Sequence, residues 1–132
     1  MAHSPPKTDK RLLGTWKSDR RRTFSEWIFR RKPTPEKLRK LRAIFGKLQI
    51  TYTRTRIRSL YHDDQQTRVY KVLGPDEESV AIGTKVVAKH IRIQHIHFDG
   101  PDRYWISLSG RNREWFRRVP KSPRAATRSK MT

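Results

Sequence analysis

Short segments in which β-branched or aromatic residues alternate with polar ones occupy most of the chain from residue 50 to residue 119. Alternation with a period of two is typical of strands that bury one face, and it limits the possible folds strongly. Clusters rich in Gly, Pro, Asn and Asp separate the segments and indicate turns. The pattern predicts an antiparallel meander with strands over residues 50–58, 67–73, 79–87, 91–98, 104–109 and 114–119.

Residues 12–48 precede this meander and predict a short first strand followed by two helices. Apolar spacings of three and four indicate helices over about residues 24–31 and 35–47. The second has Thr34 as a hydroxyl N-cap and Pro35 in its first turn. Its apolar stripe suits either a lid packed on the strands or a helix in a membrane interface, and its other positions are mostly basic. The stripe consists of Leu38, Leu41, Phe45 and Leu48.

The expected fold class is therefore mainly β with α. We expect an antiparallel up-and-down barrel, or a strongly curved sheet, of about seven strands with a helical insertion after the first strand. A chain of 132 residues makes one domain, placed at residues 12–119. Residues 1–11 and 120–132 are basic, rich in Pro and poor in apolar residues, which predicts flexible tails.

The charge predicts an anionic partner. The chain contains 32 Lys and Arg against 12 Asp and Glu, a net charge of +20. Seven of these cations and one acid lie in the tails, so residues 12–118 alone carry +14. A folded body this positive attracts nucleic acid, acidic proteins or small anions. The sequence does not choose among them, and it leaves the oligomeric state open.

Several function classes are disfavoured by the composition. The chain has no cysteine, which excludes disulfides, thiolate nucleophiles and Cys-ligated zinc. No catalytic triad spacing and no phosphate-binding Gly-rich loop is present, so we expect no enzyme and no cofactor. No apolar run approaches the length of a membrane span and the N-terminus has no signal-like apolar region, so we expect a cytoplasmic protein.

The segment Leu12-Leu13-Gly14-Thr15-Trp16-Lys17 resembles the Gly-x-Trp signature that opens the first strand in the calycin superfamily, which includes lipocalins and fatty-acid-binding proteins. The resemblance implies a barrel with helices after the first strand and an arginine near the C-terminus packed over Trp16. Arg117 or Arg118 suits that role. Fatty-acid-binding proteins also end in an Arg-x-Tyr pair that Arg117-Arg118-Val119 lacks, whereas Thr67-Arg68-Val69-Tyr70 looks similar to that pair in mid-chain.

The first functional hypothesis is a non-enzymatic protein whose barrel holds a small anionic or amphipathic ligand. Alternation places three arginines on one strand face, in line with Ile50 and Tyr52, where they either converge at a barrel mouth or face water. Aromatic residues on the strands supply the remaining contacts or belong to the core. The candidate ligand-binding residues are Arg54, Arg56, Tyr52, Tyr70 and Trp105, and the structural motif consists of Gly14, Trp16, Arg117 and Arg118.

The alternative hypothesis is a basic protein that binds nucleic acid or another polyanion through phosphate contacts. Its candidate residues are Lys37, Arg39, Lys40 and Arg58, and aromatic residues interleaved with arginine also suit a stacking surface. Docking of an acidic protein is a third possibility. His95 and His97 share a strand face and would bind a metal only with a third ligand such as His62, His90 or Asp99, so we expect no metal site.

Overall fold

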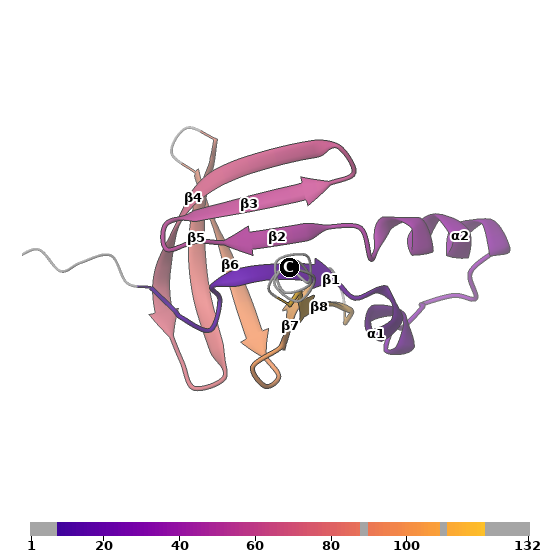
Figure 1. The fold of residues 1–132 in the computed structure, drawn as a ribbon. Coiled ribbons are helices and arrows are strands. Elements are labelled where there is room, and N and C mark those ends of the chain that lie inside the picture. Colours follow the sequence, from indigo (N-terminus) through magenta and orange to yellow (C-terminus); the bar gives the residue numbers. More distant parts are fainter. Residues whose placement is uncertain (1–7, 88–89, 109–110, 121–132) are drawn as a thin grey trace, which may run out of the picture.

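The computed structural model describes residues 8–87, 90–108 and 111–120, and these residues form eight strands and two helices (Figure 1). In chain order the elements are β1 (Gly14–Ser18), α1 (Arg20–Ser25), α2 (Pro35–Ile44), β2 (Gln49–Tyr52), β3 (Arg56–Tyr61), β4 (Asp64–Pro75), β5 (Ser79–Val87), β6 (His90–Phe98), β7 (Arg103–Ser107) and β8 (Arg113–Arg118).

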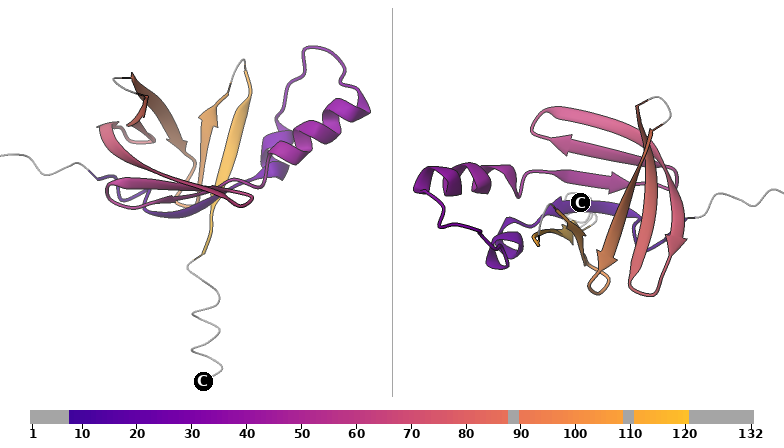
Figure 2. Two further views of the ribbon diagram at one scale, coloured as in Figure 1. Left: turned by 90° about the horizontal axis from the view of Figure 1, so that it is seen from above. Right: turned by 180° about the vertical axis from the view of Figure 1, so that it is seen from behind.

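The strands form a closed antiparallel barrel in simple up-and-down order. Each strand pairs with the next, and β8 pairs with β1 to close the barrel. Both helices lie in the connection from β1 to β2 and extend to one side of the barrel (Figures 1 and 2). The predicted mainly β class, the antiparallel barrel and the helical insertion after the first strand are confirmed, and the barrel has eight strands where about seven were expected.

The additional strand arises because the predicted strand over residues 50–58 is wrong. The chain reverses at residues 53–55, so β2 and β3 form a hairpin. Thr53 makes this turn: its Oγ1 accepts a hydrogen bond from the Arg56 amide at 3.0 Å, and its own amide donates to the Arg56 carbonyl at 2.9 Å. The turn contains no Gly, Pro, Asn or Asp, and a threonine hydroxyl is a weaker turn signal than any of these.

Tertiary contacts also move the first helix from its predicted place. α1 begins earlier than predicted, after the N-cap Asp19, whose side chain accepts from the Arg22 amide at 3.1 Å, and it ends at Ser25 instead of residue 31. Beyond it, the backbone of Ile28 pairs with the side chain of Asn112 through two hydrogen bonds, which replace the helical ones. α2 begins as predicted, with Thr34 accepting from the Lys37 amide at 3.2 Å, and ends at Ile44.

The N-terminal tail is shorter than predicted, because residues 8–11 belong to the folded domain. Asp9 is buried and accepts hydrogen bonds from the amide and guanidinium of Arg11. Arg11 also donates to the carbonyls of Glu77 and Ser79, which ties this segment to the turn between β4 and β5. The rest of the predicted tails, residues 1–7 and 121–132, lies outside the described residues.

The core fills the barrel near the end where the chain enters β1. Trp16 is fully buried there, and its indole nitrogen donates to the Leu12 carbonyl at 2.8 Å. Burial of the aromatic and aliphatic side chains of this core supplies the main stabilising term of a small domain. The cluster consists of Leu12, Trp16, Tyr52, Tyr70, Val72, Val80, Ile82, Ile96, Tyr104 and Phe116.

Candidate functional site

The register of the strands identifies side chains that point into the barrel beyond the core. On β4, Tyr70 and Val72 belong to the core, so alternation places Arg68 on the same inner face. Arg68 is paired with Ile57, which packs against the core. On β6, Ile96 is a core residue, and alternation likewise places Arg92 inside, opposite Thr84 of β5.

These inward positions become progressively exposed away from the core. Arg68 and Arg92 are exposed, whereas the inward residues nearer the core are buried. The interior is therefore open to solvent along this stretch of β3 to β6. The stretch consists of the hairpins β3–β4 and β5–β6 (Figures 1 and 2). We call this region the open half of the interior, and it consists of Ser59, Gln66, Arg68, Thr84, Arg92 and Gln94.

The chemistry of the open half is cationic above an apolar floor. Ile57, Tyr70 and Ile82 form the floor, and the guanidinium of Arg68 donates a hydrogen bond to the Gln66 side chain at 3.3 Å. Asp64 is on the same face at the tip of the hairpin and is exposed. Two guanidinium groups next to apolar surface suit a ligand that has both an anionic head and an apolar body.

A buried carboxylate lies on the inner face of β8. Glu114 accepts a hydrogen bond from the Ser18 hydroxyl at 2.6 Å, and that hydroxyl in turn accepts from the Gly46 amide at 3.0 Å. Burial raises the pKa of Glu114, and the hydrogen bond from Ser18 opposes this only in part. The surroundings of Glu114 therefore disfavour the charged form of this carboxyl.

Two of the residues predicted to bind ligand belong to the core. The hydroxyl of Tyr52 lies 3.0 Å from that of Tyr104, and both rings are buried. The Tyr70 hydroxyl donates to the Thr53 carbonyl at 2.6 Å. Burial raises the pKa of Tyr52 and of Tyr70, so both phenols stay neutral. Tyr70 forms part of the floor of the open half, and Tyr52 lies deeper.

The three arginines predicted to share one face do not do so. Arg54 lies in the turn between β2 and β3, while Arg56 and Arg58 are exposed on the outer face of β3. The prediction that they continue the line of Ile50 and Tyr52 is wrong, because the turn at residues 53–55 inverts the phase of the alternation. Arg56 and Arg58 therefore point away from the barrel interior, and Arg54 is exposed in the turn.

Trp105 also lies on the outside, where it forms an aromatic ladder with neighbours on adjacent strands. Its ring stacks on His97 of β6, with centroids 4.0 Å apart and an interplanar angle of 12°. Arg113 covers the Trp105 ring at 4.3 Å. Burial lowers the pKa of His97, and the charges of His95 and Arg113 add to this effect. In the described ranges, no set of three His, Asp or Glu side chains is arranged to hold a metal ion.

The motif of the first strand is built around Arg118. Its guanidinium lies 4.2 Å from the centre of the Trp16 ring and donates to the carbonyls of Leu13 and Arg11 at 2.7 and 2.8 Å. Arg117 instead points outward and is exposed. Gly14 has φ +116°, and a Cβ there would lie 2.9 Å from Nη1 of Arg118. A side chain at Gly14 therefore conflicts with both the backbone and the arginine.

Lys37, Arg39 and Lys40 are exposed on α2, which does not pack on the barrel as a lid. α2 buries no residue, and Figure 2 shows it extending away from the strands. At its C-terminal end, Phe45 is buried against the rings of Phe24 and Trp27. Of the predicted apolar stripe, Phe45 thus contacts α1 and the segment that follows it, whereas Leu48 packs against the barrel core.

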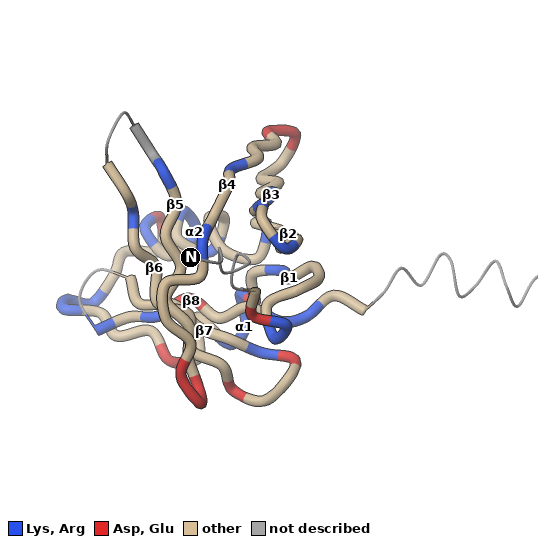
Figure 3. Tube along the Cα trace, turned by 90° about the vertical axis from the view of Figure 1, so that its left-hand side faces the viewer, with Lys and Arg blue, Asp and Glu red and all other residues tan. Residues whose placement is uncertain are grey.

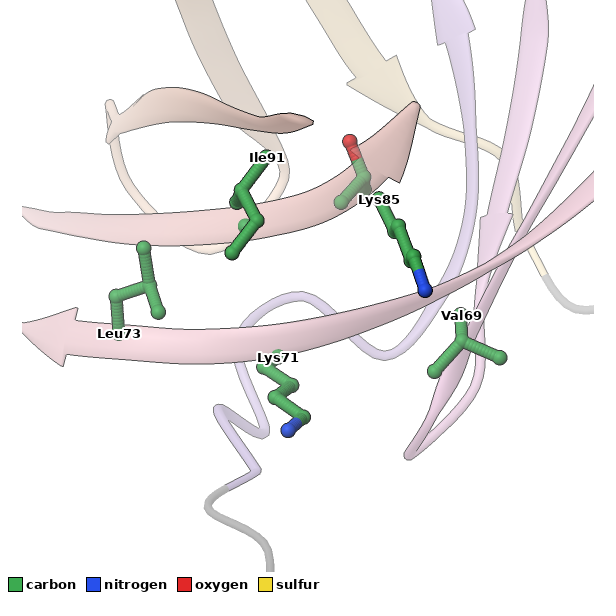
Figure 4. A pocket seen from close by; sticks show the side chains of 7 residues that line it. Val69, Lys71, Leu73, Lys85 and Ile91 are labelled. Atoms are coloured by element: carbon green, nitrogen blue, oxygen red, sulfur yellow. The ribbon is translucent and has the colours of Figure 1, made fainter. Parts of the chain in front are cut away.

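The sequence did not identify Arg68 and Arg92 as site residues. In an alternating strand the apolar residues are expected to face inward and the charged residues outward, and near the open half this arrangement is reversed. On β6 the aliphatic Ile91 and Ile93 point outward and are exposed, while Arg92 points inward. Of these two residues, Ile91 borders a groove of about 480 Å³ on the outer face (Figure 4). Its lining residues are Val69, Lys71, Leu73, Gly83, Thr84, Lys85 and Ile91. The Arg68-Val69-Tyr70 motif was the one available signal for an inward arginine.

Comparisons of the chain with protein-family models, with curated proteins and with solved structures found no significant match. Neither helix in the described part of the chain is long and apolar enough to cross a membrane.

Proposed function

We propose that the protein is a non-enzymatic binding protein of calycin-like architecture, and that the open half of the interior holds a small anionic amphiphile. The observation that carries the proposal is the pair of inward-facing, exposed arginines, Arg68 and Arg92, above an apolar floor. An arginine that faces a barrel interior must be hydrated or paired with an anion. The contact of Arg118 with Trp16 supports the calycin-like part of the proposal.

The proposed mode of binding divides the ligand between two environments. A carboxylate or sulfonate head accepts hydrogen bonds from the guanidinium groups, which form strong bidentate pairs with such anions. The apolar part of the ligand covers Ile57 and Ile82 and is thereby transferred from water to an apolar surface. Charge and apolar area then both contribute to affinity.

Titration with a fluorescent anionic amphiphile, anilinonaphthalene sulfonate, tests this proposal on the full-length, nuclease-treated protein. The variant Arg68→Gln/Arg92→Gln removes both inward cations. Loss of a hydrogen bond to a charged group costs about 1.5–3 kcal/mol, so we expect Kd to rise at least tenfold. The matched control, Arg56→Gln/Arg58→Gln, removes the same charge from the outer face of β3 and should change Kd less than threefold. Equal effects in the two variants would contradict the proposed site.

Nucleic acid or another polyanion is the alternative partner suggested by the net charge of +20. Lys37, Arg39, Lys40 and Arg58 are all exposed and available to phosphates. Binding through phosphate contacts weakens steeply between about 50 and 200 mM salt, whereas binding in a partly apolar interior depends far less on salt. Parallel titrations with DNA and RNA oligonucleotides at these two salt concentrations separate the alternatives.

A further inference from the structure

The connection from β1 to β2 forms a projecting arm, residues 20–47, whose base is fixed to the barrel (Figure 2). Thr23 is fully buried, and its hydroxyl accepts from the Trp115 amide at 2.9 Å. The Trp115 indole donates to Glu26 at 2.8 Å, and the Asn112 side chain holds the backbone of Ile28. Beyond this base, α2 buries no residue. The arm is thus an anchored structure with most of its surface free of the barrel.

Positive charge is concentrated on the arm. Residues 20–47 contain eleven Lys and Arg and two Glu, a net charge of +9. Both glutamates face a cation of the arm itself: Glu26 lies 3.1 Å from Arg22, and Glu36 lies 3.6 Å from Lys40. The acids of the barrel instead gather mainly near its turns, as Figure 3 shows. The arm therefore presents a cationic surface to any partner.

Exposed apolar side chains lie within this cationic surface. Ile28, Phe29 and Ile44 are 54%, 38% and 51% exposed. A groove of about 700 Å³ runs between the segment after α1 and α2. Its apolar lining consists of Trp27, Phe29, Pro33, Leu41 and Ile44, and its basic lining consists of Arg30, Arg31, Lys32, Lys37 and Lys40.

This combination distinguishes between the polyanions that the charge alone admits. A nucleic acid uses cations and stacked aromatic rings but gains little from the exposed aliphatic side chains of Ile28 and Ile44. A bilayer of anionic phospholipid uses both features, because its headgroups attract Lys and Arg while the acyl boundary accepts apolar side chains. Long basic side chains also extend to the headgroups while their stems lie on apolar surface.

We propose that the arm docks the protein on the surface of an anionic phospholipid bilayer, with Ile28, Phe29 and Ile44 entering the interface and the surrounding Lys and Arg contacting the headgroups. The proposal does not depend on a ligand in the barrel. It assigns the helical insertion a role as an interaction surface.

Cosedimentation with lipid vesicles tests the electrostatic part. The full-length, nuclease-treated protein should sediment with vesicles of phosphatidylcholine and phosphatidylserine, but not with phosphatidylcholine alone, and raised salt should weaken binding. The variant Lys37→Gln/Arg39→Gln/Lys40→Gln should bind about a hundredfold more weakly, since each cation near the surface contributes about fivefold. The control Arg56→Gln/Arg58→Gln/Lys71→Gln removes the same charge from the barrel and should lose less than fivefold. Equal losses in the two variants would overturn the docking surface.

Quenching of tryptophan by brominated acyl chains tests the apolar part. Trp27 lines the groove of the arm, so bound protein should be quenched, and Trp27→Phe should remove most of the quenching while sedimentation persists. Ile28→Ser/Phe29→Ser should weaken sedimentation at least tenfold. Ile91→Ser/Ile93→Ser, which changes comparably exposed side chains on β6, should have little effect. Oligonucleotide binding that requires the arm cations, together with no vesicle binding, would refute the proposal in favour of nucleic acid.

Discussion

Replacement of Arg118 by methionine tests how the barrel is closed. The Arg118 guanidinium contacts the Trp16 ring and donates to three backbone carbonyls: Leu13 at 2.7 Å, Arg11 at 2.8 Å and Pro101 at 3.1 Å. These carbonyls belong to segments before β1 and before β7. One side chain on β8 therefore joins three parts of the chain at the end of the barrel where the chain enters β1.

The expected cost of Arg118→Met is about 3 kcal/mol. Hydrogen bonds from a charged donor contribute about 1.5–3 kcal/mol each, and a cation over an aromatic ring contributes about 0.5–2 kcal/mol. The Arg118 side chain is 27% exposed, so water replaces part of what is lost, and the sum of these values is an upper bound. The ion pair with Asp102, at 3.4 Å and largely exposed, adds at most about 1 kcal/mol. Methionine retains the apolar contact with Trp16.

Urea unfolding followed by tryptophan fluorescence measures this cost. With a slope of about 1.5 kcal/mol per molar urea, the midpoint should fall by about 2 M. The control is Arg117→Met, the adjacent exposed arginine on the outer face, which should change the free energy of unfolding by less than about 0.5 kcal/mol. If both variants unfold at the same urea concentration, the contacts of Arg118 do not stabilise the end of the barrel where the chain enters β1.

Two further substitutions test the inner wall and the first strand. Burial disfavours the charged form of Glu114, and its raised pKa means that wild-type stability falls as pH rises through the unfolded-state value and is lowest above the folded-state pKa. Thermal unfolding should therefore show that Glu114→Gln is more stable than wild type at pH 8 but not at pH 3. An equal difference at both pH values would show that burial does not raise the pKa of this carboxyl. Gly14→Ala should lower the free energy of unfolding by about 2–4 kcal/mol, through backbone strain and contact with Arg118. Gly100→Ala, with φ +74° but no neighbouring atom within 4 Å, should cost only about 1 kcal/mol, and a larger loss there than at Gly14 would contradict the steric argument.

Local signals in the sequence determined most of the secondary structure. Alternation located the strand over residues 79–87 with the bounds that the structure has, and the Thr34-Pro35 pair located the start of α2. The Gly14-x-Trp16 motif indicated the start of the barrel. These signals depend on residues within a few positions of one another, so one chain is sufficient to read them.

The candidate site was decided by the tertiary structure. Alternation shows that Arg68 and Tyr70 share a face, and that Arg92 and Ile96 do, but it does not show which face is inside. Closure of the barrel assigns those faces, and where the interior is open to water an arginine can point inward while Ile91 and Ile93 point outward. The threonine turn at residues 53–55 likewise depends on pairing between β2 and β3. The sequence therefore determined the elements and their charge, while pairing between distant strands decided which charges face the interior.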